Sequence, residues 1–295
     1  MTLRLEGCFT ALTTPFRADG QVDEPALRRL VRRQAQAGVS GLVPCGSTGE
    51  AATLTHSEFL RVLEITLRES QGQLPVIAGI SANATWKALE LSREAERLGA
   101  DGLLALVPYY NKPTQEGMYR HFREIAANTR LPIIVYNIPG RTGVNLSPKT
   151  LARIASDCPN VVAVKEAAGS LDQVSEILSL SPKLTVLSGD DSLTLPMMAV
   201  GAKGVISVVS NIAPQQTEAL CRAFLSGQNK KAAKLHLKMF PLIKALFIET
   251  NPIPIKAAQE MLGLCRADLR LPLTLMSSAN RALLRREIKA FGAPR

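Results

Sequence analysis

Eight short apolar runs alternate along most of this chain with segments of helical periodicity. Near-continuous apolar runs separated by amphipathic segments are typical of parallel strands that are buried on both faces of a sheet. Eight such units within about 220 residues predict a closed (β/α)8 barrel, the TIM-barrel form of the α/β class. The runs cover residues 8–14, 40–45, 75–80, 102–107, 132–137, 161–165, 184–188 and 204–209.

The pattern changes near residue 225, where strand signals stop and helical periodicity continues to the end. We therefore expect a barrel catalytic domain over residues 1–224 and a small C-terminal helical extension over residues 225–295. The length of 295 residues fits this division, since such a barrel takes about 250 residues.

Charge and composition bear on whether this protein binds nucleic acid. Lys and Arg total 35 against 25 Asp and Glu, and the net charge of +10 permits a nucleic-acid partner. However, the four arginines between residues 28 and 33 alternate with apolar residues at helical spacing, as on a solvated helix face over a core. Aromatic residues make up only 4% and form no stacking platform. We expect no nucleic-acid partner, while the excess positive charge would concentrate small carboxylate substrates.

Cysteine usage and hydropathy indicate a cytoplasmic protein. The five cysteines form no C-x-x-C pair, and an odd count is typical of free thiols in a reducing cytosol. Cys45 beside Gly46 is better explained as a small buried thiol than as a nucleophile. Glu6 interrupts the N-terminal segment, which therefore does not resemble a signal peptide. No uncharged stretch of 18 apolar residues exists, so we expect no membrane span.

The functional prediction depends on Lys165, which follows the buried run V-V-A-V at residues 161–164. Barrels of this kind carry their catalytic groups at the carboxyl ends of the strands. Desolvation there can lower a lysine pKa from about 10.4 towards about 7 to 8, giving a neutral amine that forms a Schiff base with a keto acid. Alternation places Val161 and Ala163 on the face of Lys165 and Glu166 on the other, so Glu166 is a poor partner. A lysine paired with another acid, or extending along its stem to solvent, is the alternative.

The second apolar run leads into G-S-T-G-E at residues 46–50. This segment completes most of a phosphate-loop pattern, but Ser47 stands where the loop's lysine must be, so we predict no nucleotide. The hydroxyls of Ser47 and Thr48 could donate to a carboxylate, or they could cap a helix.

The fourth and fifth runs lead into P-Y-Y-N-K-P, with Tyr109 and Tyr110, and Y-N-I-P-G-R-T-G, with Tyr136 and Arg141. A strand-end tyrosine held by a hydroxyl can transfer protons, and Tyr136 with Thr48 would form such a relay. Packing at the barrel rim is the alternative for any one of the tyrosines. The planar guanidinium of Arg141 could bind a carboxylate bidentately, or it could be an ordinary surface arginine.

Two further groups of polar residues predict no catalytic role. Asp190 and Asp191 in S-G-D-D-S suggest a paired acid and base, but both stand where a strand gives way to a helix, and we expect them to act as N-caps. His56, His121 and His236 follow no metal-ligand spacing, so we predict no metal site.

Taken in order, the motifs resemble those of the pyruvate-dependent class I aldolase family, nearly from end to end. This resemblance implies that Lys165 forms the Schiff base with pyruvate while Thr48, Tyr136 and Tyr110 relay protons. It also implies that Tyr110 reaches the site of a neighbouring subunit across a tight dimer, within a homotetramer, and that no cofactor is needed. The motifs are A-L-T-T-P-F, G-S-T-G-E-A-A-T-L, P-Y-Y-N-K-P-T-Q-E-G, Y-N-I-P-G-R-T-G, V-V-A-V-K-E, S-G-D-D-S, G-V-I-S-V-V-S-N and N-P-I-P-I-K.

The resemblance also implies the substrate contacts. Ser47 and Thr48 would hold the pyruvate carboxylate, Ile206 would offer its backbone carbonyl, and Arg141 would bind the carboxylate of L-aspartate-4-semialdehyde. Members that cleave sialic acid typically lack this arginine, so its presence favours condensation of pyruvate with the semialdehyde, in diaminopimelate and lysine biosynthesis. One alternative is a related enzyme acting on a sugar acid or a hydroxyproline-derived keto acid. Another is a catalytically inactive barrel that serves as a basic binding module.

The chain departs from the family pattern at the cavity where lysine-inhibited members bind lysine. His56, Asn83 and Tyr109 match that pattern, but Lys87 replaces an acidic residue and Phe59 replaces a frequent histidine. A cation facing the lysine ammonium would repel it by roughly 1 kcal/mol or more at about 4 Å. We therefore expect lysine to inhibit this protein weakly or not at all.

Overall fold

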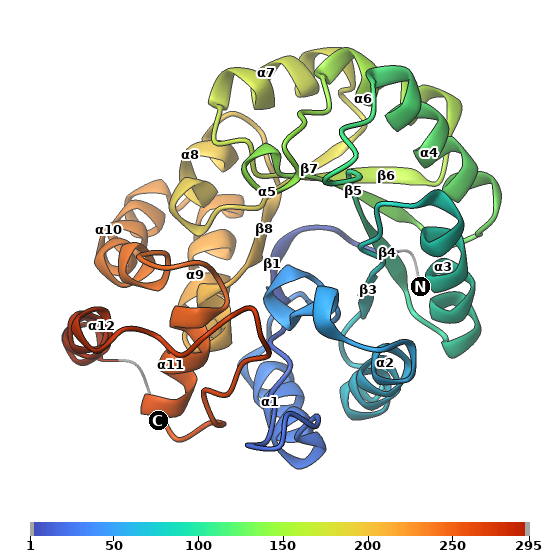
Figure 1. The fold of residues 1–295 in the computed structure, drawn as a ribbon. Coiled ribbons are helices and arrows are strands. Elements are labelled where there is room, and N and C mark those ends of the chain that lie inside the picture. The colour runs from blue at the N-terminus through green and yellow to red at the C-terminus, as the bar shows by residue number, and fades with distance from the viewer. Residues whose placement is uncertain (1–2, 293–295) are drawn as a thin grey trace.

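Eight parallel strands form a barrel that is surrounded by helices (Figure 1). The computed structural model describes residues 3–292. Each of the eight apolar runs overlaps one strand, so the predicted (β/α)8 barrel is confirmed. The strands are β1 (Gly7–Ala11), β2 (Gly41–Val43), β3 (Ile77–Gly79), β4 (Gly102–Leu106), β5 (Ile133–Asn137), β6 (Val161–Glu166), β7 (Thr185–Ser188) and β8 (Gly204–Ser207).

Helices follow the strands in alternation and then continue to the C-terminal end. The α-helices are α1 (Glu24–Ala37), α2 (His56–Ser70), α3 (Thr85–Leu98), α4 (Gln115–Ala127), α5 (Pro139–Thr142), α6 (Pro148–Asp157), α7 (Leu171–Leu180), α8 (Thr194–Ala199), α9 (Pro214–Leu225), α10 (Asn229–Leu246), α11 (Ile253–Met261) and α12 (Ser278–Phe291). Short 3-10 helices are η1 (Ser47–Gly49), η2 (Ala51–Thr53), η3 (Asp191–Leu193) and η4 (Val209–Asn211).

The barrel is nearly closed, with its weakest joint between β2 and β3. The strands pair in the order β2-β1-β8-β7-β6-β5-β4-β3, and a single parallel bridge between Leu42 and Val76 connects the two ends. The Gly79 N–H also donates to the carbonyl of Pro44 at 3.0 Å. A Cβ at Gly79 would lie 2.3 Å from the Cys45 carbonyl oxygen, so this close approach requires glycine.

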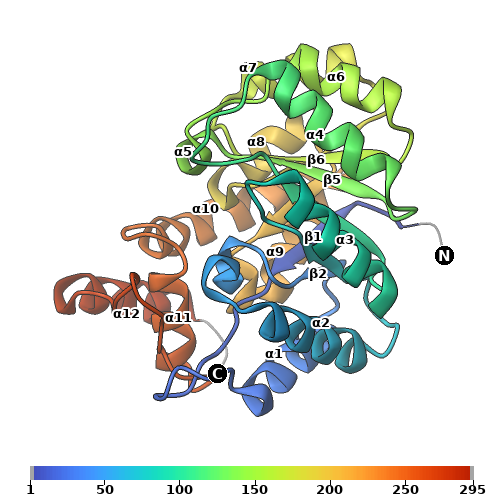
Figure 2. The same cartoon turned by 45° about the vertical axis from the view of Figure 1, so that its right-hand side comes forward.

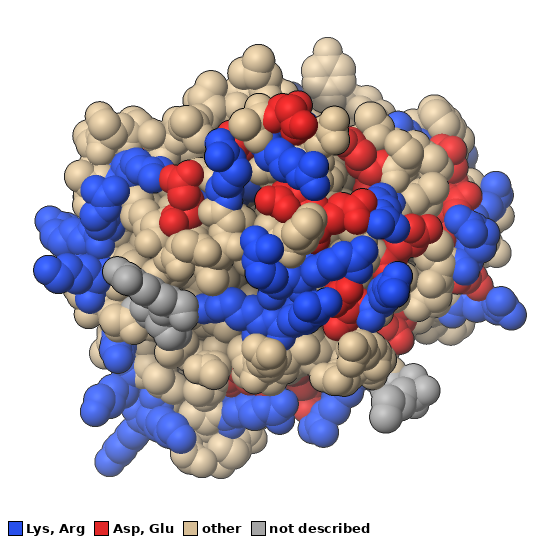
Figure 3. Space-filling model, turned by 90° about the horizontal axis from the view of Figure 1, so that it is seen from below, with Lys and Arg blue, Asp and Glu red and all other residues tan. Residues whose placement is uncertain are grey.

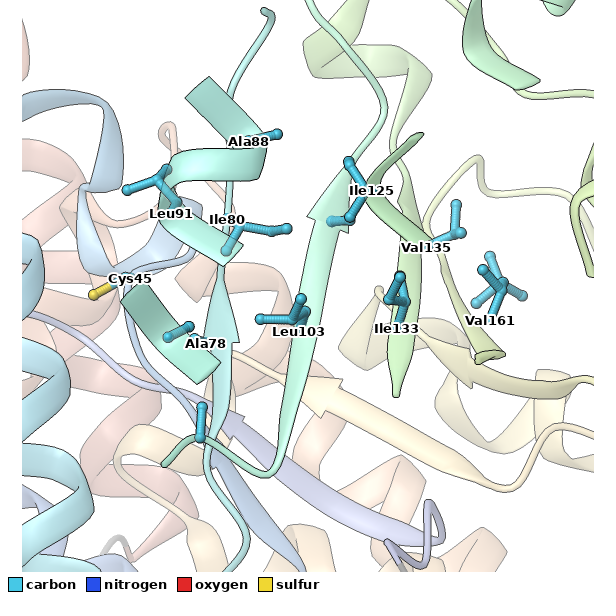
Figure 4. Packing of buried hydrophobic residues seen from close by; sticks show 14 of the residues in the cluster. Cys45, Ala78, Ile80, Ala88, Leu91, Leu103, Ile125, Ile133, Val135 and Val161 are labelled. Carbon is cyan, nitrogen blue, oxygen red and sulfur yellow. The ribbon is translucent and has the colours of Figure 1, made fainter. Parts of the chain in front are cut away.

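Two apolar layers stabilise the barrel. Inside it, Phe9, Leu104 and Ile134 belong to one buried cluster. Outside it, strand residues such as Leu103 pack with helix residues such as Leu91 in a larger cluster, part of which Figure 4 shows. This arrangement explains why the strands are apolar on both faces, as the sequence pattern indicated.

The start of β6 corrects one detail of the predicted alternation. Consecutive residues Ile133 and Ile134 of β5 pair with Val161 and Ala163 of β6, so Val162 is the extra residue of a β-bulge. Val161 therefore packs in the outer cluster, whereas Ala163 packs inside the barrel. The prediction that Val161 shares the face of Lys165 is wrong, because the bulge reverses the alternation before Ala163.

Helices α10, α11 and α12 lie to one side of the barrel in Figures 1 and 2. They share an apolar cluster with the barrel, which includes Val205 of β8, Leu220 of α9, Leu242 of α10 and Leu284 of α12. The C-terminal helices thus pack on β8 and α9, and the division near residue 225 stays a prediction. Over residues 3–292, the structure has no helix with the length and apolar character that a membrane crossing requires.

Charged side chains of both signs lie close together on the face shown in Figure 3. Helix α1 illustrates the pattern predicted for its arginines. Arg28 and Arg32 both contact Glu69 of α2 at 2.6 Å, while Leu27 and Leu30 on the same helix are buried. These two arginines of α1 are therefore paired with a carboxylate of α2, and the apolar face of α1 packs on the core.

Candidate active site

Lys165 and Tyr136 stand side by side at the carboxyl ends of β6 and β5. The two residues are paired in the sheet register, and the Lys165 Nζ lies 4.1 Å from the centroid of the Tyr136 ring. Lys165 is only 5% exposed. Burial lowers its pKa to about 7, with a nearby Asp191 raising it and Arg141 lowering it further. Lys165 therefore carries a far larger share of neutral, nucleophilic amine at neutral pH than a solvent-exposed lysine does.

The local structure directs Lys165 away from its neighbour in sequence, as predicted. The carboxylate of Glu166 accepts hydrogen bonds from the Asn137 side chain at 3.0 Å and from the Ala168 N–H at 2.7 Å. A Cβ at Gly189 would lie 3.1 Å from the Lys165 Cε and 2.7 Å from the Ala167 Cβ. Glycine at this position therefore leaves room for the Lys165 side chain.

Asp190 and Asp191 have different partners. Asp190 accepts a hydrogen bond from the Ser192 N–H at 2.7 Å and caps η3, which confirms its prediction. Asp191 instead accepts from the N–H groups of Val208 and Val209, at 2.9 and 3.0 Å, beyond β8. The prediction that Asp191 caps the helix after its own strand is wrong, because its buried carboxylate accepts from backbone N–H groups at the start of η4, which the fold brings next to it. Burial raises the pKa of Asp191, although these backbone donors oppose the shift.

Tyr136 is buried, and burial raises its pKa to about 12, while Arg141 and a hydrogen bond with Ser47 act in the opposite direction. Ser47 and Thr48 begin η1, whose N-cap is Gly46 without a side-chain hydrogen bond, so the capping alternative for these two hydroxyls is wrong. The structure gives Thr48 a partner that the sequence did not suggest.

That partner is Asn251, whose Nδ2 donates to the Thr48 Oγ1 at 2.9 Å. The proton relay between Thr48 and Tyr136 stays a prediction. Asn251 belongs to the motif N-P-I-P-I-K, which contributes to the family resemblance but predicts no partner for the asparagine. Its position about 200 residues from Thr48 left no local signal for the contact.

A cavity of about 270 Å³ opens beside these residues. Arg141 of α5 lines it and donates from Nη2 to the Asn251 carbonyl oxygen at 2.8 Å. Ser47 and Tyr109 also line this cavity, which we call the mouth cavity. Lys165 is not part of the cavity wall. Arg141, which is, lies close enough for its positive charge to lower the pKa of Lys165. A larger cavity of about 600 Å³ lies at the opposite, amino end of β1.

Two predicted residues lie outside this group. Ile206 pairs with Phe9 in the sheet, and its side chain is buried inside the barrel. Tyr110 is 87% exposed and has a left-handed backbone with a φ of 75°. Within one chain, Tyr110 therefore presents its ring to the surface rather than to a buried site.

The residues of the predicted regulatory site come together around a second cavity of about 180 Å³. The mouth cavity and this cavity share Tyr109 and Ser81 in their walls. The predicted residues that line the second cavity are His56, Phe59, Asn83, Lys87 and Tyr109.

Potential metal ligands and the cysteine thiols are two further polar features of the described residues. No group of three or more His, Cys, Asp or Glu side chains between residues 3 and 292 could hold a metal ion. Burial raises the pKa of the Cys45 thiol, which disfavours the reactive thiolate.

The fold and site define an eight-stranded α/β barrel with a buried, weakly basic lysine at the carboxyl end of its sixth strand. Residues 4–291 match the dihydrodipicolinate synthetase family, and the chain belongs to that family. It is 52% identical over 288 residues to the 4-hydroxy-tetrahydrodipicolinate synthase of Pelobacter propionicus, covering 97% of this chain and 99% of that protein. The family prediction made from the motifs is therefore confirmed.

Solved structures agree in both fold and length. The dihydrodipicolinate synthase from Aquifex aeolicus superposes with a TM-score of 0.96 at 48% identity, covering 98% of this chain and 99% of that one. The chloride-inhibited dihydrodipicolinate synthase from Acinetobacter baumannii, complexed with pyruvate, gives a TM-score of 0.96 at 41% identity, covering 98% and 100%.

Proposed function

We propose that this protein condenses pyruvate with L-aspartate-4-semialdehyde to give 4-hydroxy-tetrahydrodipicolinate, in diaminopimelate and lysine biosynthesis. The observation that carries the proposal is Lys165, a lysine that is 5% exposed at a strand end with a pKa lowered to about 7. Relatives that carry the name of this activity, and one that was solved with pyruvate, support the choice of substrates.

The neutral Nζ of Lys165 attacks the keto carbon of pyruvate, and loss of water leaves a carbon–nitrogen double bond. Loss of a methyl proton gives an enamine, whose carbon attacks the aldehyde of the second substrate. The amino group of that substrate then attacks the imine carbon and releases Lys165 as the ring closes. Tyr136 would transfer these protons, because it stands beside Lys165 in the sheet register; burial raises its pKa to about 12, and the charge of Arg141 and a hydrogen bond with Ser47 oppose that rise.

Carboxylate groups on both substrates suit the polar groups near Lys165. Ser47 and Thr48 would donate hydrogen bonds to the pyruvate carboxylate, and the backbone carbonyl of Ile206 would accept one from the reacting centre. Arg141 lines the mouth cavity and would bind the carboxylate of the semialdehyde. No cofactor is required by this sequence of steps.

The proposal includes a homotetramer built from tight dimers and a cytoplasmic location. Tyr110 supports the dimer, because its ring is 87% exposed and its backbone is left-handed, a strained conformation that clusters at functional positions. In the dimer it would complete the proton relay of the neighbouring subunit.

Borohydride reduction in the presence of pyruvate, followed by peptide mass mapping, tests the proposal. We expect one reduced adduct, on Lys165, and none without pyruvate. Lys256, a second fully buried lysine, is an internal control that should stay unmodified. An adduct on another lysine, or no adduct, would overturn the assignment.

Turnover of the semialdehyde by an Arg141→Ala variant tests the second substrate. We expect kcat/KM for the semialdehyde to fall about 100-fold, since a charge-assisted contact to a carboxylate is lost, while the pyruvate adduct on Lys165 still forms. Unchanged kcat/KM, or a preference of the wild type for a sugar acid, would instead favour another aldolase of the same family.

A further inference from the structure

We propose that Asn251 is a positioning residue that orients the hydroxyl of Thr48, so that the C-terminal segment forms part of the catalytic site. This inference rests on the proposed function. It concerns a motif, N-P-I-P-I-K, that the proposed mechanism does not use.

The contact itself is buried and specific. The Asn251 Nδ2 donates to the Thr48 Oγ1 at 2.9 Å, and both side chains are at least nine-tenths buried, with exposed fractions of 7% and 4%. The backbone carbonyl of Asn251 accepts from Arg141 Nη2 at 2.8 Å. Asn251 therefore touches two of the residues that the mechanism assigns to the substrate carboxylates.

A hydroxyl group has one proton to donate and two lone pairs that accept. Because the Asn251 amide occupies a lone pair of Thr48, the hydroxyl proton must point elsewhere. Thr48 is thereby fixed as a donor, the role that both carboxylate binding and proton relay require. Without the amide, the hydroxyl could rotate and spend much of its time in other orientations.

The amide oxygen of Asn251, Oδ1, also supports a functional role for this residue. The Asn251 Oδ1 is buried and has no hydrogen-bond partner within residues 3–292. An unsatisfied buried carbonyl destabilises the fold, and a purely structural side chain usually avoids it. Asn251 also lines the mouth cavity, so the unpaired oxygen belongs to a residue in contact with the substrate space.

A second contact holds the same loop without help from Asn251. Two residues after Thr48, Glu50 pairs with Lys256 of α11 at 2.5 Å, and the two side chains are 1% and 0% exposed. Lys256 also donates to the Asp268 carbonyl at 2.7 Å, and Glu50 accepts from the Arg270 N–H at 3.1 Å. The loop backbone is thus anchored separately, so a change at Asn251 alters mainly the orientation of the Thr48 hydroxyl.

A double-mutant cycle between Asn251 and Thr48 tests the proposal in the full-length protein. We expect Asn251→Ala to lower kcat about tenfold or more in the wild type, and less than twofold in a Thr48→Val background, where no hydroxyl remains to orient. An equal loss in both backgrounds would show that Asn251 supports the fold rather than Thr48, and would overturn the proposal.

Asn280→Ala is the matched control. Asn280 is the same residue type in the C-terminal segment, and its Nδ2 donates to Glu249 at 2.7 Å rather than to the loop. It should leave kcat unchanged in both backgrounds. Should Asn251→Ala not fold by circular dichroism, Asn251→Asp replaces it, since this near-isosteric carboxylate can only accept from Thr48 and should show the same dependence on the hydroxyl.

Borohydride trapping with pyruvate on every variant separates this proposal from the function on which it rests. A Lys165 adduct in all variants with no coupling between Asn251 and Thr48 would overturn only the role of Asn251. Absence of the adduct in the wild type would overturn the proposed function and this inference together.

Discussion

At the scale of single residues, two buried lysines show how surroundings decide between charge and nucleophilicity. Burial lowers the pKa of both Lys165 and Lys256. Lys256 has Glu50 at 2.5 Å, and the charge and hydrogen bond of that carboxylate oppose the shift. Lys165 has no carboxylate within 4.0 Å in the described residues, and only the more distant charge of Asp191 opposes its desolvation. The same residue type therefore has a carboxylate partner in one place and none in the other, where the proposed function uses it as an amine nucleophile.

Replacing Lys165 by methionine should stabilise the protein at neutral pH. The unfolded chain binds a proton at this lysine up to a pKa of about 10.4, whereas the folded chain releases it near 7. Below pH 7 the full cost of burying the charge is present, and stability rises with pH between these two values. We expect Lys165→Met to raise the free energy of unfolding by up to about 4 kcal/mol at pH 7.

Urea denaturation of wild type and Lys165→Met at pH 7 and pH 10 measures this difference. The gain should shrink at the higher pH, where the amine is neutral in the folded wild type. A variant that is less stable than the wild type at pH 7 would contradict the lowered pKa.

The sequence allowed only part of the site to be predicted at this scale. Lys165 could be found because a lysine after four apolar residues is unusual wherever the strand is buried. Asn251 and Asp191 could not be assigned their contacts, because these contacts form between segments that only the closed barrel brings together. The unpaired bulge residue Val162 was also missed, since nothing in V-V-A-V marks it.

At the scale of elements, an apolar pattern predicts which residues are buried more reliably than it predicts which residues pair in a strand. The first run was expected to extend to residue 14, but β1 ends at Ala11. Leu12 and Thr13 are still buried, although the Thr13 N–H donates to the Asn211 side chain rather than to a neighbouring strand. The number and order of strands could therefore be predicted, while their ends depend on which polar groups satisfy the backbone.

The ion pair between Glu50 and Lys256 connects the loop after β2 with α11, and its loss should destabilise the protein. We expect Lys256→Met to lower the free energy of unfolding by about 3 to 5 kcal/mol, because Glu50 is left buried and unpaired. The double variant Glu50→Gln with Lys256→Met should recover much of this loss, since no charge stays buried.

Urea denaturation of the single and double variants measures these effects. Lys230→Met, at an exposed position of α10, is the control and should change stability by less than about 0.5 kcal/mol. If the double variant is as unstable as Lys256→Met alone, packing rather than charge explains the loss.

At the scale of the whole molecule, the 180 Å³ cavity allows a prediction about regulation. Lys87 and His56 line it, and an added lysine ammonium would meet the positive charge of Lys87. We expect lysine to inhibit the wild type weakly or not at all, and Lys87→Glu to increase the affinity for lysine at least about tenfold, because repulsion becomes attraction. Titration of activity with lysine measures both, with Lys87→Gln as the neutral control. Potent inhibition of the wild type would refute the prediction.

The proposed dimer provides the last prediction, because Tyr110 is 87% exposed in the single chain whereas Lys165 is buried, and the proposal assigns Tyr110 to the partner's site. A Lys165→Ala variant and a Tyr110→Phe variant should each have little activity alone. In a mixed dimer, the subunit that keeps Lys165 receives an intact Tyr110 from its partner, so one of its two sites is complete. Random mixing gives half of the dimers this composition, and activity should return to about a quarter of the wild-type value.

Denaturing the two variants together and refolding them at equal concentrations measures this recovery. Each variant refolded alone is the control, because it shows the activity left without exchange of subunits. Recovery that rises with the fraction of mixed dimers, separated by a charge tag on one variant, would locate Tyr110 in the partner's site. Activity that stays at the level of the separate variants would mean that Tyr110 acts elsewhere, and the relay would then need a donor from the same chain as Lys165.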